Sequence, residues 1–239
     1  EWLRARFPEG FAYAGNSGAD LQIWNHATSA IPVNASARTL SRIAGLRQEA
    51  SFDSRAGQWN GLIRSMRFRH WSKNLLIFVP LFVGHAYKKL ADVFTAAEGF
   101  ALLCLLASAT YMLNDIADLE ADRAHHVKRR RPFASGELPV AFGLTVAPVL
   151  IAAALAGAFL LSHTFAAALA LYLALTLAYS FGLKQLPLVD VFVISMLFVL
   201  RIVMGTAVLA LAYSPWLLTF SGAFFLSLAL AKRHVEVVR

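Results

Sequence analysis

Three aspartates near the middle of the chain have the spacing of one helix face. Asp115, Asp118 and Asp122 follow a long apolar run, and Asn114 directly precedes the first of them. At about 100° per residue, the three carboxylates fall within about 60° of arc if a single helix carries them. Carboxylates this close raise one another's pKa unless a cation neutralises them, and such hard oxygen ligands suit Mg²⁺ that bridges to phosphate. The alternative is a solvated acidic helix end that pairs with the basic segment 123–131.

The elements that position these aspartates belong in a membrane. Of the 239 residues, 58% are hydrophobic and only 15% are charged, which is too apolar for an ordinary soluble domain. The net charge of +8 resides in short basic clusters beside apolar runs, so we expect no nucleic-acid partner. Cys104 is the single cysteine, which excludes an intrachain disulfide and a cysteine cluster for zinc.

Six segments are apolar over roughly the 20 residues that a membrane-spanning helix needs. Pro80 is expected to bend the first of them. Basic residues gather in alternate loops, before the first span and after the second, fourth and sixth. Such loops favour the cytoplasm, so we expect a protein of the cytoplasmic (inner) membrane whose termini and aspartates face the cytoplasm. The predicted spans are residues 72–88, 94–116, 138–161, 164–182, 188–212 and 215–232.

The first 60 residues are polar and predict a small α/β fragment followed by a linker. Alternation and turn residues predict a strand at 11–15, a helix at 19–28 and a short strand at 31–34. Residues 36–60, rich in Ser, Arg, Gly and Gln, predict a linker with one short helix. The chain starts without an initiator methionine, which predicts a piece of a longer protein.

The segment YMLNDIADLEADRAHHVKRRRPFASG, residues 111–136, surrounds the three aspartates. In length, order and its closing Arg-Pro pair it resembles the first aspartate-rich motif of the UbiA prenyltransferase superfamily. The resemblance covers about residues 60–239. It implies a bundle of membrane-spanning helices, typically nine, that uses Mg²⁺ to bind a diphosphate and transfers a group to or from a polyprenyl substrate. It also implies metal-binding and catalytic roles for Asp115, Asp118 and Asp122, with Asn114 as a substrate-binding neighbour.

Polar residues at the ends of other spans extend this resemblance. Lys73 and Asn74 stand at the first span, and Lys184 follows the fourth. The lysines are interpreted either as substrate ligands or as topological anchors that snorkel to the interface. Arg201 lies about a dozen residues into the fifth span, where a charge is costly. We expect it either to contact an anionic substrate or to form a buried ion pair that positions helices.

A second aspartate-rich motif, which aromatic prenyltransferases of this superfamily carry, is not found. Lys232 and Arg233 follow the sixth span instead. Together with Arg123 and Lys128, they resemble the branch that transfers phosphoribose from phosphoribosyl diphosphate (PRPP) to decaprenyl phosphate. Two phosphorylated substrates carry more negative charge than one, so cations can replace a second acidic set. The alternative is a positive-inside cluster at the end of a span.

Residues 1–35 carry a second resemblance. The sequence from Tyr13 to Asp20, YAGNSGAD, is similar to the last motif of haloacid dehalogenase-type hydrolases, in which a glycine turn after a strand presents Mg²⁺-binding acids. Asn16 stands where that family usually has Asp, and the family's nucleophilic D-x-D is absent from these residues. Such a fragment alone is no phosphatase, and Asp20 is interpreted as a helix N-terminal residue or a residual metal ligand.

These observations predict an all-α, multi-span membrane bundle at residues 61–239, preceded by an α/β fragment and a linker. We expect Mg²⁺-assisted displacement of diphosphate from PRPP by a polyprenyl phosphate, with Lys73 and Arg201 on the lipid phosphate. One alternative is an aromatic or tetrapyrrole polyprenyltransferase with a prenyl diphosphate donor. Another, from a different class, is a membrane transporter or scaffold. The cations expected on the donor phosphates are Arg123, Lys128, Arg131, Lys232 and Arg233.

Overall fold

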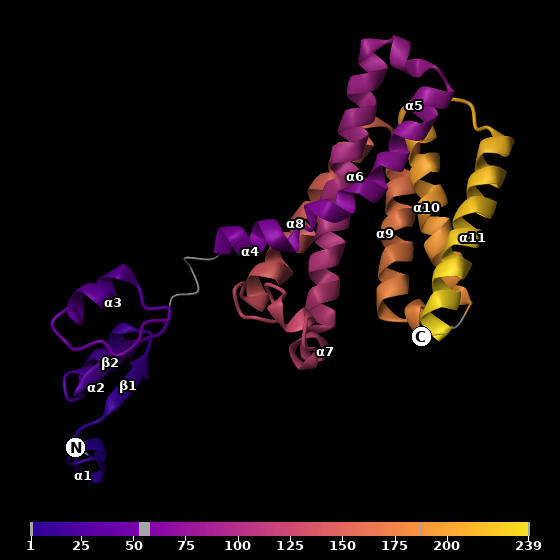
Figure 1. Cartoon of the computed structure of the whole chain (residues 1–239). Helices are drawn as coiled ribbons and strands as arrows, with labels where there is room; N and C mark the ends of the chain where they lie inside the picture. The colour runs from indigo at the N-terminus through magenta and orange to yellow at the C-terminus, as the bar shows by residue number, and fades with distance from the viewer. Residues whose placement is uncertain (1, 53–57, 187, 239) are drawn as a thin grey trace. The chain divides into compact units, whose positions relative to one another are not determined.

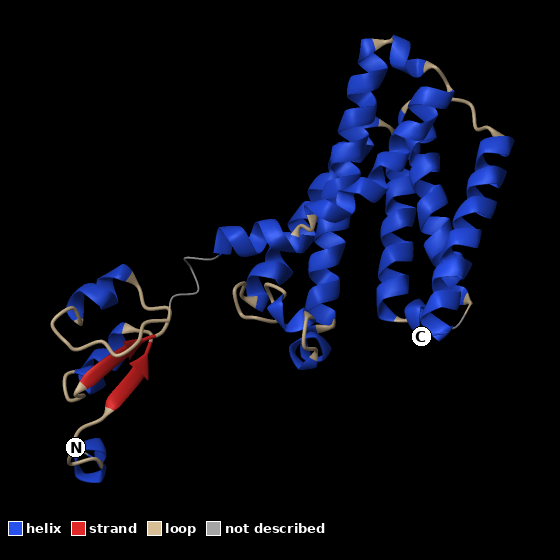
Figure 2. Cartoon of the chain, viewed as in Figure 1, coloured by secondary structure: helices blue, strands red, loops and turns tan. Residues whose placement is uncertain are grey.

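The computed structural model describes residues 2–52, 58–186 and 188–238, which divide into two compact units. The first unit is Glu1–Gly61 with Gly136–Leu138, and the second is Leu62–Ser135 with Pro139–Arg239. Figure 2 shows that the strands of the described chain lie in the first unit and that the second unit is helical. Each unit has its own buried core.

Two parallel strands form the centre of the first unit. They pair in register, with Ala12 opposite Ser29 and Gly15 opposite Pro32. Trp24 in the crossover is fully buried, and its indole N–H donates to the Tyr13 carbonyl at 2.8 Å. The predicted strand–helix–strand order is present, although the helix is shorter than expected because the chain turns after Trp24. The elements are α1 (Trp2–Arg6), β1 (Ala12–Gly15), η1 (Gly18–Asp20), α2 (Leu21–Trp24), β2 (Ser29–Pro32) and α3 (Ala37–Arg42).

Part of the predicted linker packs against this sheet. Leu40, Ile43 and Leu46 are spaced by three residues, and Ile43 is buried beside Trp24. Isolated bridges also join Ala30 to Gln48 and Val33 to Phe52. The first unit therefore includes residues that their polar composition had assigned to a linker. Residues 53–57 of that linker lie outside the described residues.

The second unit is a bundle of helices (Figure 1). Five of its described helices are long and apolar enough to cross a membrane, which agrees with the second to sixth predicted spans. They are α6 (Leu90–Ala117), α8 (Val140–Leu161), α9 (His163–Phe181), α10 (Val189–Val208) and α11 (Pro215–Val238). The shorter elements are α4 (Gln58–Ser65), η2 (Phe68–Phe78), α5 (Val79–Val83), η3 (Ala86–Lys88), α7 (Leu119–Ala124), η4 (Lys128–Arg130) and η5 (Leu183–Gln185).

The first predicted span, residues 72–88, is not one α-helix. It consists of the 3-10 helix η2, then α5, then η3. Pro80 lies in the first turn of α5, where its missing N–H needs no partner, so a new helix starts at this point. The backbone of η2 lies directly against α10, because a Cβ atom on Gly205 would be only 2.0 Å from the Ile77 carbonyl oxygen. The glycine thus permits contact between the two segments.

Small side chains let the long helices pack closely. Ala147, Ala154 and Ala158 of α8 are fully buried, and a Cβ atom on Gly157 would lie 2.7 Å from the side chain of Leu102 on α6. Burial differs strongly among the spans: 61% of the apolar window of α10 is buried, against 6% of that of α11. Since α10 carries Arg201, that charge lies in the interior of the bundle.

Candidate active site

The acidic motif spans a helix break. The predicted 60° arc assumes one continuous helix, but α6 ends at Ala117 and α7 begins at Leu119. Asp118 at the junction has φ −91° and ψ 13°, outside the α-helical region. The three carboxylates therefore do not share one face. Asp115 in α6 and Asp122 in α7 contact the same arginine, whereas Asp118 at the junction contacts a lysine.

Asp115 and Asp122 form a buried pair that Arg131 joins. Their side chains are 2% exposed. The Arg131 Nη1 donates to Asp115 Oδ1 at 3.0 Å and to Asp122 Oδ2 at 2.6 Å. Asp115 also accepts from Arg67 Nη2 at 2.5 Å, and the Arg67 guanidinium lies over the Tyr111 ring at 5.2 Å. Charge-assisted contacts of this kind make up for the loss of hydration at buried carboxylates.

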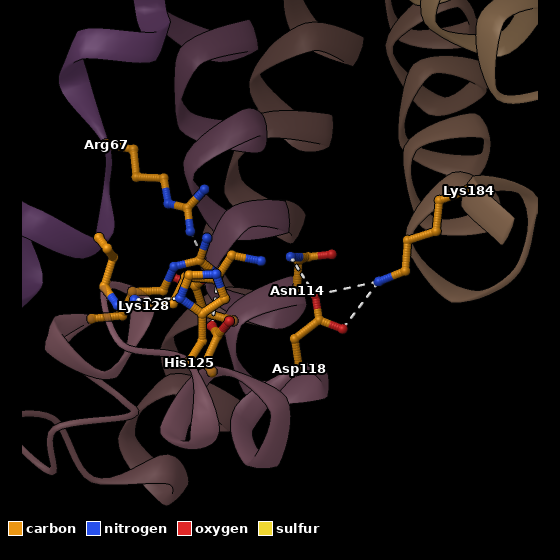
Figure 3. A network of polar contacts seen from close by, with 10 residues as sticks. Arg67, Asn114, Asp118, His125, Lys128 and Lys184 are labelled. Atoms are coloured by element: carbon orange, nitrogen blue, oxygen red, sulfur yellow. Dashed lines mark hydrogen bonds and ion pairs between the residues drawn. The ribbon is translucent and has the colours of Figure 1, made fainter. Parts of the chain in front are cut away.

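Asp118 has different partners and is more exposed. Its carboxylate accepts from Lys184 Nζ at 3.0 and 3.3 Å and from Asn114 Nδ2 at 3.2 Å. The side chains of both Lys184 and Asp118 are 33% exposed. Figure 3 shows Lys184 reaching across to Asp118 from one side, whereas Arg67, His125 and Lys128 lie on the other. The motif therefore has a buried half, Asp115 and Asp122, and an exposed half, Asn114 and Asp118.

The expected convergence of three carboxylates on one metal is not present among the described residues, where no group of three or more His, Cys, Asp or Glu side chains could hold an ion. Arg67 and Arg131 neutralise Asp115 and Asp122, and Lys184 neutralises Asp118 from another side. The ligand atoms of these side chains nevertheless suit Mg²⁺, because Asn114 and the three aspartates supply hard oxygen ligands within about two turns of chain.

A central cavity of about 400 Å³ opens beside the exposed half of the motif. Four cationic residues line it, and none of the described lining residues is a carboxylate. Thr176 also lines it, and its hydroxyl is buried without a hydrogen-bond partner among the described residues. An unpartnered buried hydroxyl and several cations are the lining expected of a site for an anion. The polar lining includes Arg67, Lys73, Arg201, Lys232, Asn114 and the hydroxyls of Tyr111, Tyr172 and Tyr179.

Arg201 is buried in this cavity without a carboxylate partner among the described residues. It is 5% exposed, and its Nε donates to Asn74 Oδ1 at 3.0 Å and its Nη2 to the Tyr172 hydroxyl at 2.9 Å. Nη1 donates to the Leu197 carbonyl, and the guanidinium lies over the rings of Tyr172 and Phe198. The buried ion pair offered as an alternative is therefore not found. Neutral partners orient the group and leave its positive charge for an anion.

The cavity gathers some of the residues predicted from sequence and leaves others apart. It brings together Lys73, Asn114, Arg201 and Lys232, with Asn74 held behind Arg201. Lys128 lines a different pocket, and Arg123 donates to the Ala134 carbonyl at a long 3.4 Å. Arg233 lies 3.9 Å from Asp190, at the end of a smaller pocket that Lys184 and Lys232 also line.

Arg67 is a site residue that sequence reasoning did not select. The basic residues before the first span indicate its cytoplasmic end, and the spacing from Arg67 to Asn74 adds to the family resemblance, but neither assigns Arg67 a role in the site. In the structure it contacts Asp115, 48 positions away, and lines both the central cavity and a second pocket. Its φ of 52° is in the left-handed region, which is uncommon for a residue with a side chain. The spacing Arg67-x-x-x-Trp71-x-Lys73 was the available signal.

Asp20 in the first unit has a structural role. Its Oδ2 accepts from the backbone N–H groups of Asn16 and Ser17, both at 2.9 Å, and from the Ser17 hydroxyl at 3.1 Å. These backbone hydrogen bonds lower the pKa of Asp20. The carboxylate closes the turn before α2, as expected of a residue at a helix N-terminus. The resemblance to haloacid dehalogenase-type hydrolases remains a prediction.

Relatives share much of this sequence but are longer. Over its whole length the chain is 48% identical to the uncharacterized protein y4nM of Sinorhizobium fredii, of which it covers 47%. Over 74% of its length it is 36% identical to the decaprenyl-phosphate phosphoribosyltransferase of Mycobacterium tuberculosis, of which it covers 60%. The chain therefore spans about half the length of these relatives, between 47% and 60%.

The fold is also found in a solved structure, a UbiA homologue from Archaeoglobus fulgidus bound to GPP and Mg²⁺. The TM-score is 0.59 at 19% sequence identity, with 70% of this chain and 60% of that chain covered. This likeness establishes the helical bundle as a shared fold. The sequence match to the UbiA prenyltransferase family covers residues 75–238, which include the aspartates, the five described spanning helices and the lining of the central cavity apart from Arg67 and Lys73. The chain is thus an integral membrane protein that belongs to the UbiA prenyltransferase family.

Proposed function

We propose that the protein transfers 5-phosphoribose from PRPP to a polyprenyl phosphate. The observation that carries this proposal is the central cavity, in which Lys73, Arg201 and Lys232 face a space whose described lining holds no carboxylate. A prenyl diphosphate and an aromatic acceptor need a second acidic set for the donor's metal ions. A phosphorylated lipid acceptor instead needs cations, which this cavity supplies.

Similar proteins support both the chemistry and its membrane setting. The relatives named decaprenyl-phosphate phosphoribosyltransferase are 36% identical over about three quarters of this chain. Membership of the UbiA family favours an enzyme over a transporter or scaffold. The structural neighbour's bound GPP and Mg²⁺ support Mg²⁺ use and keep a prenyl diphosphate donor as the competing candidate.

Asn114, Asp115, Asp118 and Asp122 are the residues that would hold Mg²⁺. When bound, the ion supplies Lewis-acid stabilisation of the negative charge that develops on the leaving diphosphate. The guanidinium groups of Arg67 and Arg131, which contact Asp115, would hold diphosphate oxygens alongside it. Lys184 would do the same from the side of Asp118.

The transfer step needs no proton from the protein. An anionic oxygen of the lipid phosphate attacks C1 of ribose, the bond from C1 to the diphosphate oxygen breaks, and the electron pair leaves with diphosphate. Lys73 and Arg201 would position the lipid phosphate in the central cavity. Asn74 and Tyr172 fix the orientation of Arg201, so the binding geometry exists before the substrate arrives.

We further propose that this site faces the cytoplasm from the inner membrane. Basic residues follow α6 within the loop 123–131 and follow the apolar part of α11, and such residues favour the cytoplasmic side, which supplies soluble donors. A cysteine substituted for Ser135 in a background without Cys104 should resist an impermeant maleimide added to intact cells. Rapid labelling of this cysteine would instead place the aspartates outside, away from cytosolic PRPP.

The donor can be tested directly with the whole protein in detergent. With Mg²⁺, PRPP and a polyprenyl phosphate, we expect diphosphate release together with a lipid-linked phosphoribose. Lys232→Glu should reduce the rate at least about tenfold, a loss of about 1.4 kcal/mol, because a repelling charge replaces a phosphate contact in the cavity. Lys88→Glu is the matched control, since Lys88 is an exposed lysine in η3 outside the cavity.

Two results would reject the proposal. One is diphosphate release that requires a prenyl diphosphate and an aromatic acceptor while PRPP is inert, which would favour the aromatic or tetrapyrrole polyprenyltransferase. The other is equal loss of rate in Lys232→Glu and Lys88→Glu, which would show that charge at the cavity has no specific role.

A further inference from the structure

A second pocket, larger than the central cavity, lies on the other side of the acidic motif. Its volume is about 670 Å³, and it is bounded by the end of α4, the start of η2 and the loop after α7. We refer to it as the basic pocket. Its polar lining is Arg64, Arg67, Arg69, His70, Lys128, Arg130, Arg131 and the single carboxylate Asp115.

The basic pocket has an excess of positive charge. Asp115 is already paired with Arg67 and Arg131. Arg69, Lys128 and Arg130 form no ion pair with any residue that the structure describes, and all three are exposed. Cations held together without carboxylates repel one another, and a multiply charged anion removes that repulsion.

Local structure holds these cations in place. His125 Nδ1 accepts from the backbone N–H groups of Val127 and Lys128, at 3.2 and 3.4 Å, and so caps the turn that leads into η4. Arg64 Nη2 donates to the Arg130 carbonyl at 2.7 Å, which ties the end of α4 to η4. Figure 3 shows His125 and Lys128 beside Arg67. The cations of two distant segments are thus presented to one space.

The surroundings of the basic pocket also affect one of its lining residues, His70. Burial and the nearby charges of Lys73, Arg67 and Arg69 lower the pKa of His70. At neutral pH His70 therefore lines the pocket as an uncharged ring that can still donate one hydrogen bond. A neutral histidine among arginines suits contact with a phosphate or a sugar hydroxyl.

Arg67 connects the basic pocket to the central cavity, because it lines both. The two spaces meet where Arg67 contacts Asp115, on the buried half of the acidic motif. Displacement at C1 requires the attacking oxygen and the leaving diphosphate on opposite sides of the carbon. A lipid phosphate that reaches C1 from the central cavity would therefore drive the diphosphate toward the basic pocket.

We propose that the basic pocket is a second anion-binding site, which holds the phosphate groups of the water-soluble donor while the central cavity holds the phosphate of the lipid. This inference rests on the proposed function for the identity of the donor. The phosphate chemistry itself rests on the pocket's own cations. A lipid headgroup also carries phosphate, and Ile63, Phe68 and Val127 add exposed apolar surface to the pocket. The experiment therefore distinguishes a phosphate of the soluble donor from a phosphate of a lipid headgroup.

The test uses the whole protein and the double variant Arg69→Gln/Lys128→Gln. Binding of inorganic diphosphate is measured by calorimetry with EDTA present, so that no metal ion contributes. Binding of PRPP is measured with Mg²⁺. Each should weaken at least about tenfold, because two charge-assisted contacts are lost. The KM for the lipid phosphate should stay unchanged.

Arg129→Gln is the matched control, because Arg129 stands between Lys128 and Arg130 but does not line the pocket. Its affinities should equal those of the unsubstituted protein. All substituted side chains are exposed, so the melting temperatures should agree. Single variants Arg69→Gln and Lys128→Gln replace the double variant if it melts early, each with a smaller loss of affinity.

Three outcomes decide the matter. Unchanged affinity for both diphosphate and PRPP in the double variant would reject the basic pocket as an anion-binding site. Loss of affinity for a short-chain anionic phospholipid added in detergent, with PRPP affinity intact, would reject the soluble donor as the ligand and assign the pocket to a lipid headgroup. If PRPP is inert as a donor but diphosphate affinity still falls, the phosphate site is supported and only the proposed function is rejected.

Discussion

The two halves of the acidic motif contain the same kind of side chain in different surroundings. In the buried half, Asp115 and Asp122 share Arg131 and are 2% exposed. In the exposed half, Asp118 pairs with Lys184, and both side chains are 33% exposed. Asp115 and Asp118 are only three positions apart, but Asp115 lies inside α6 and Asp118 stands at the junction where α6 ends.

The contrast indicates that one motif serves two physical purposes. A buried carboxylate between two arginines is costly to disrupt, because removal of one charge leaves the others without compensation. A partly exposed lysine–aspartate pair contributes little to stability and exchanges its partners readily. The buried half should therefore fix the architecture of the site, and the exposed half should respond to ligands. Substitutions in the two halves test this distinction.

The largest effect is expected from Asp115→Asn. The amide cannot compensate Arg67 and Arg131, so the free energy of unfolding should fall by about 3 kcal/mol or more, and turnover should be abolished. Thermal unfolding in detergent and diphosphate release measure the two quantities. Wild-type stability together with wild-type turnover would remove Asp115 from both roles.

Asp118→Asn should separate activity from stability. Turnover should drop at least about 100-fold if this oxygen ligand is needed for Mg²⁺, while the free energy of unfolding changes by less than about 1 kcal/mol. The same two assays apply, with Mg²⁺-dependent donor binding as a further readout. The division into halves is wrong if Asp118→Asn destabilises the protein as much as Asp115→Asn does.

A more moderate effect is expected from Lys184→Gln, which removes the cation of the exposed half. The kcat/KM for the donor should fall about tenfold through loss of one phosphate contact, and the melting temperature should hardly change. Lys89→Gln serves as a control at an exposed lysine outside the described site. Equal values of kcat/KM in both variants would show that Lys184 serves only as a topological anchor.

The smallest effect is expected from Arg123→Gln. Its one described side-chain hydrogen bond, to the Ala134 carbonyl, is long, and neither the central cavity nor the basic pocket includes it. Turnover should change by less than about threefold, as at an ordinary surface position. A loss of turnover of tenfold or more would instead support the phosphate contact that the sequence resemblance implies for Arg123.

The sequence predicted the bundle well because long apolar runs leave few alternatives to spanning helices. α6, α8 and α9 begin and end near the predicted limits, α10 ends at Val208 before its predicted limit of 212, and α11 continues to Val238 beyond its predicted limit of 232. The first span was predicted less well, because an apolar run does not distinguish one long α-helix from a 3-10 helix that is followed by the short α-helix α5. Composition also failed for residues 36–52, where a few spaced apolar side chains suffice for packing.

For the site, residue types were easier to predict than partners. The spacing of Asp115, Asp118 and Asp122 indicated oxygen ligands, but helical periodicity could not reveal the break at Asp118. The contact between Arg67 and Asp115 joins residues 48 positions apart, so it depends on how η2 packs. Arg201 was identified from its cost in a membrane, whereas its neutral partners come from three separate segments.

The missing side chain at Gly205 determines which changes the central cavity tolerates. Gly205 lies one helical turn after Arg201, and the Ile77 carbonyl of η2 occupies the space where a Cβ atom would be. A larger residue at this position must push η2 outward, and with it Asn74 and Lys73, which precede Ile77 by three and four positions. The width of the cavity is thus under remote steric control. A substitution at position 205 would therefore change the shape of the central cavity while every charged residue of this chain stays the same.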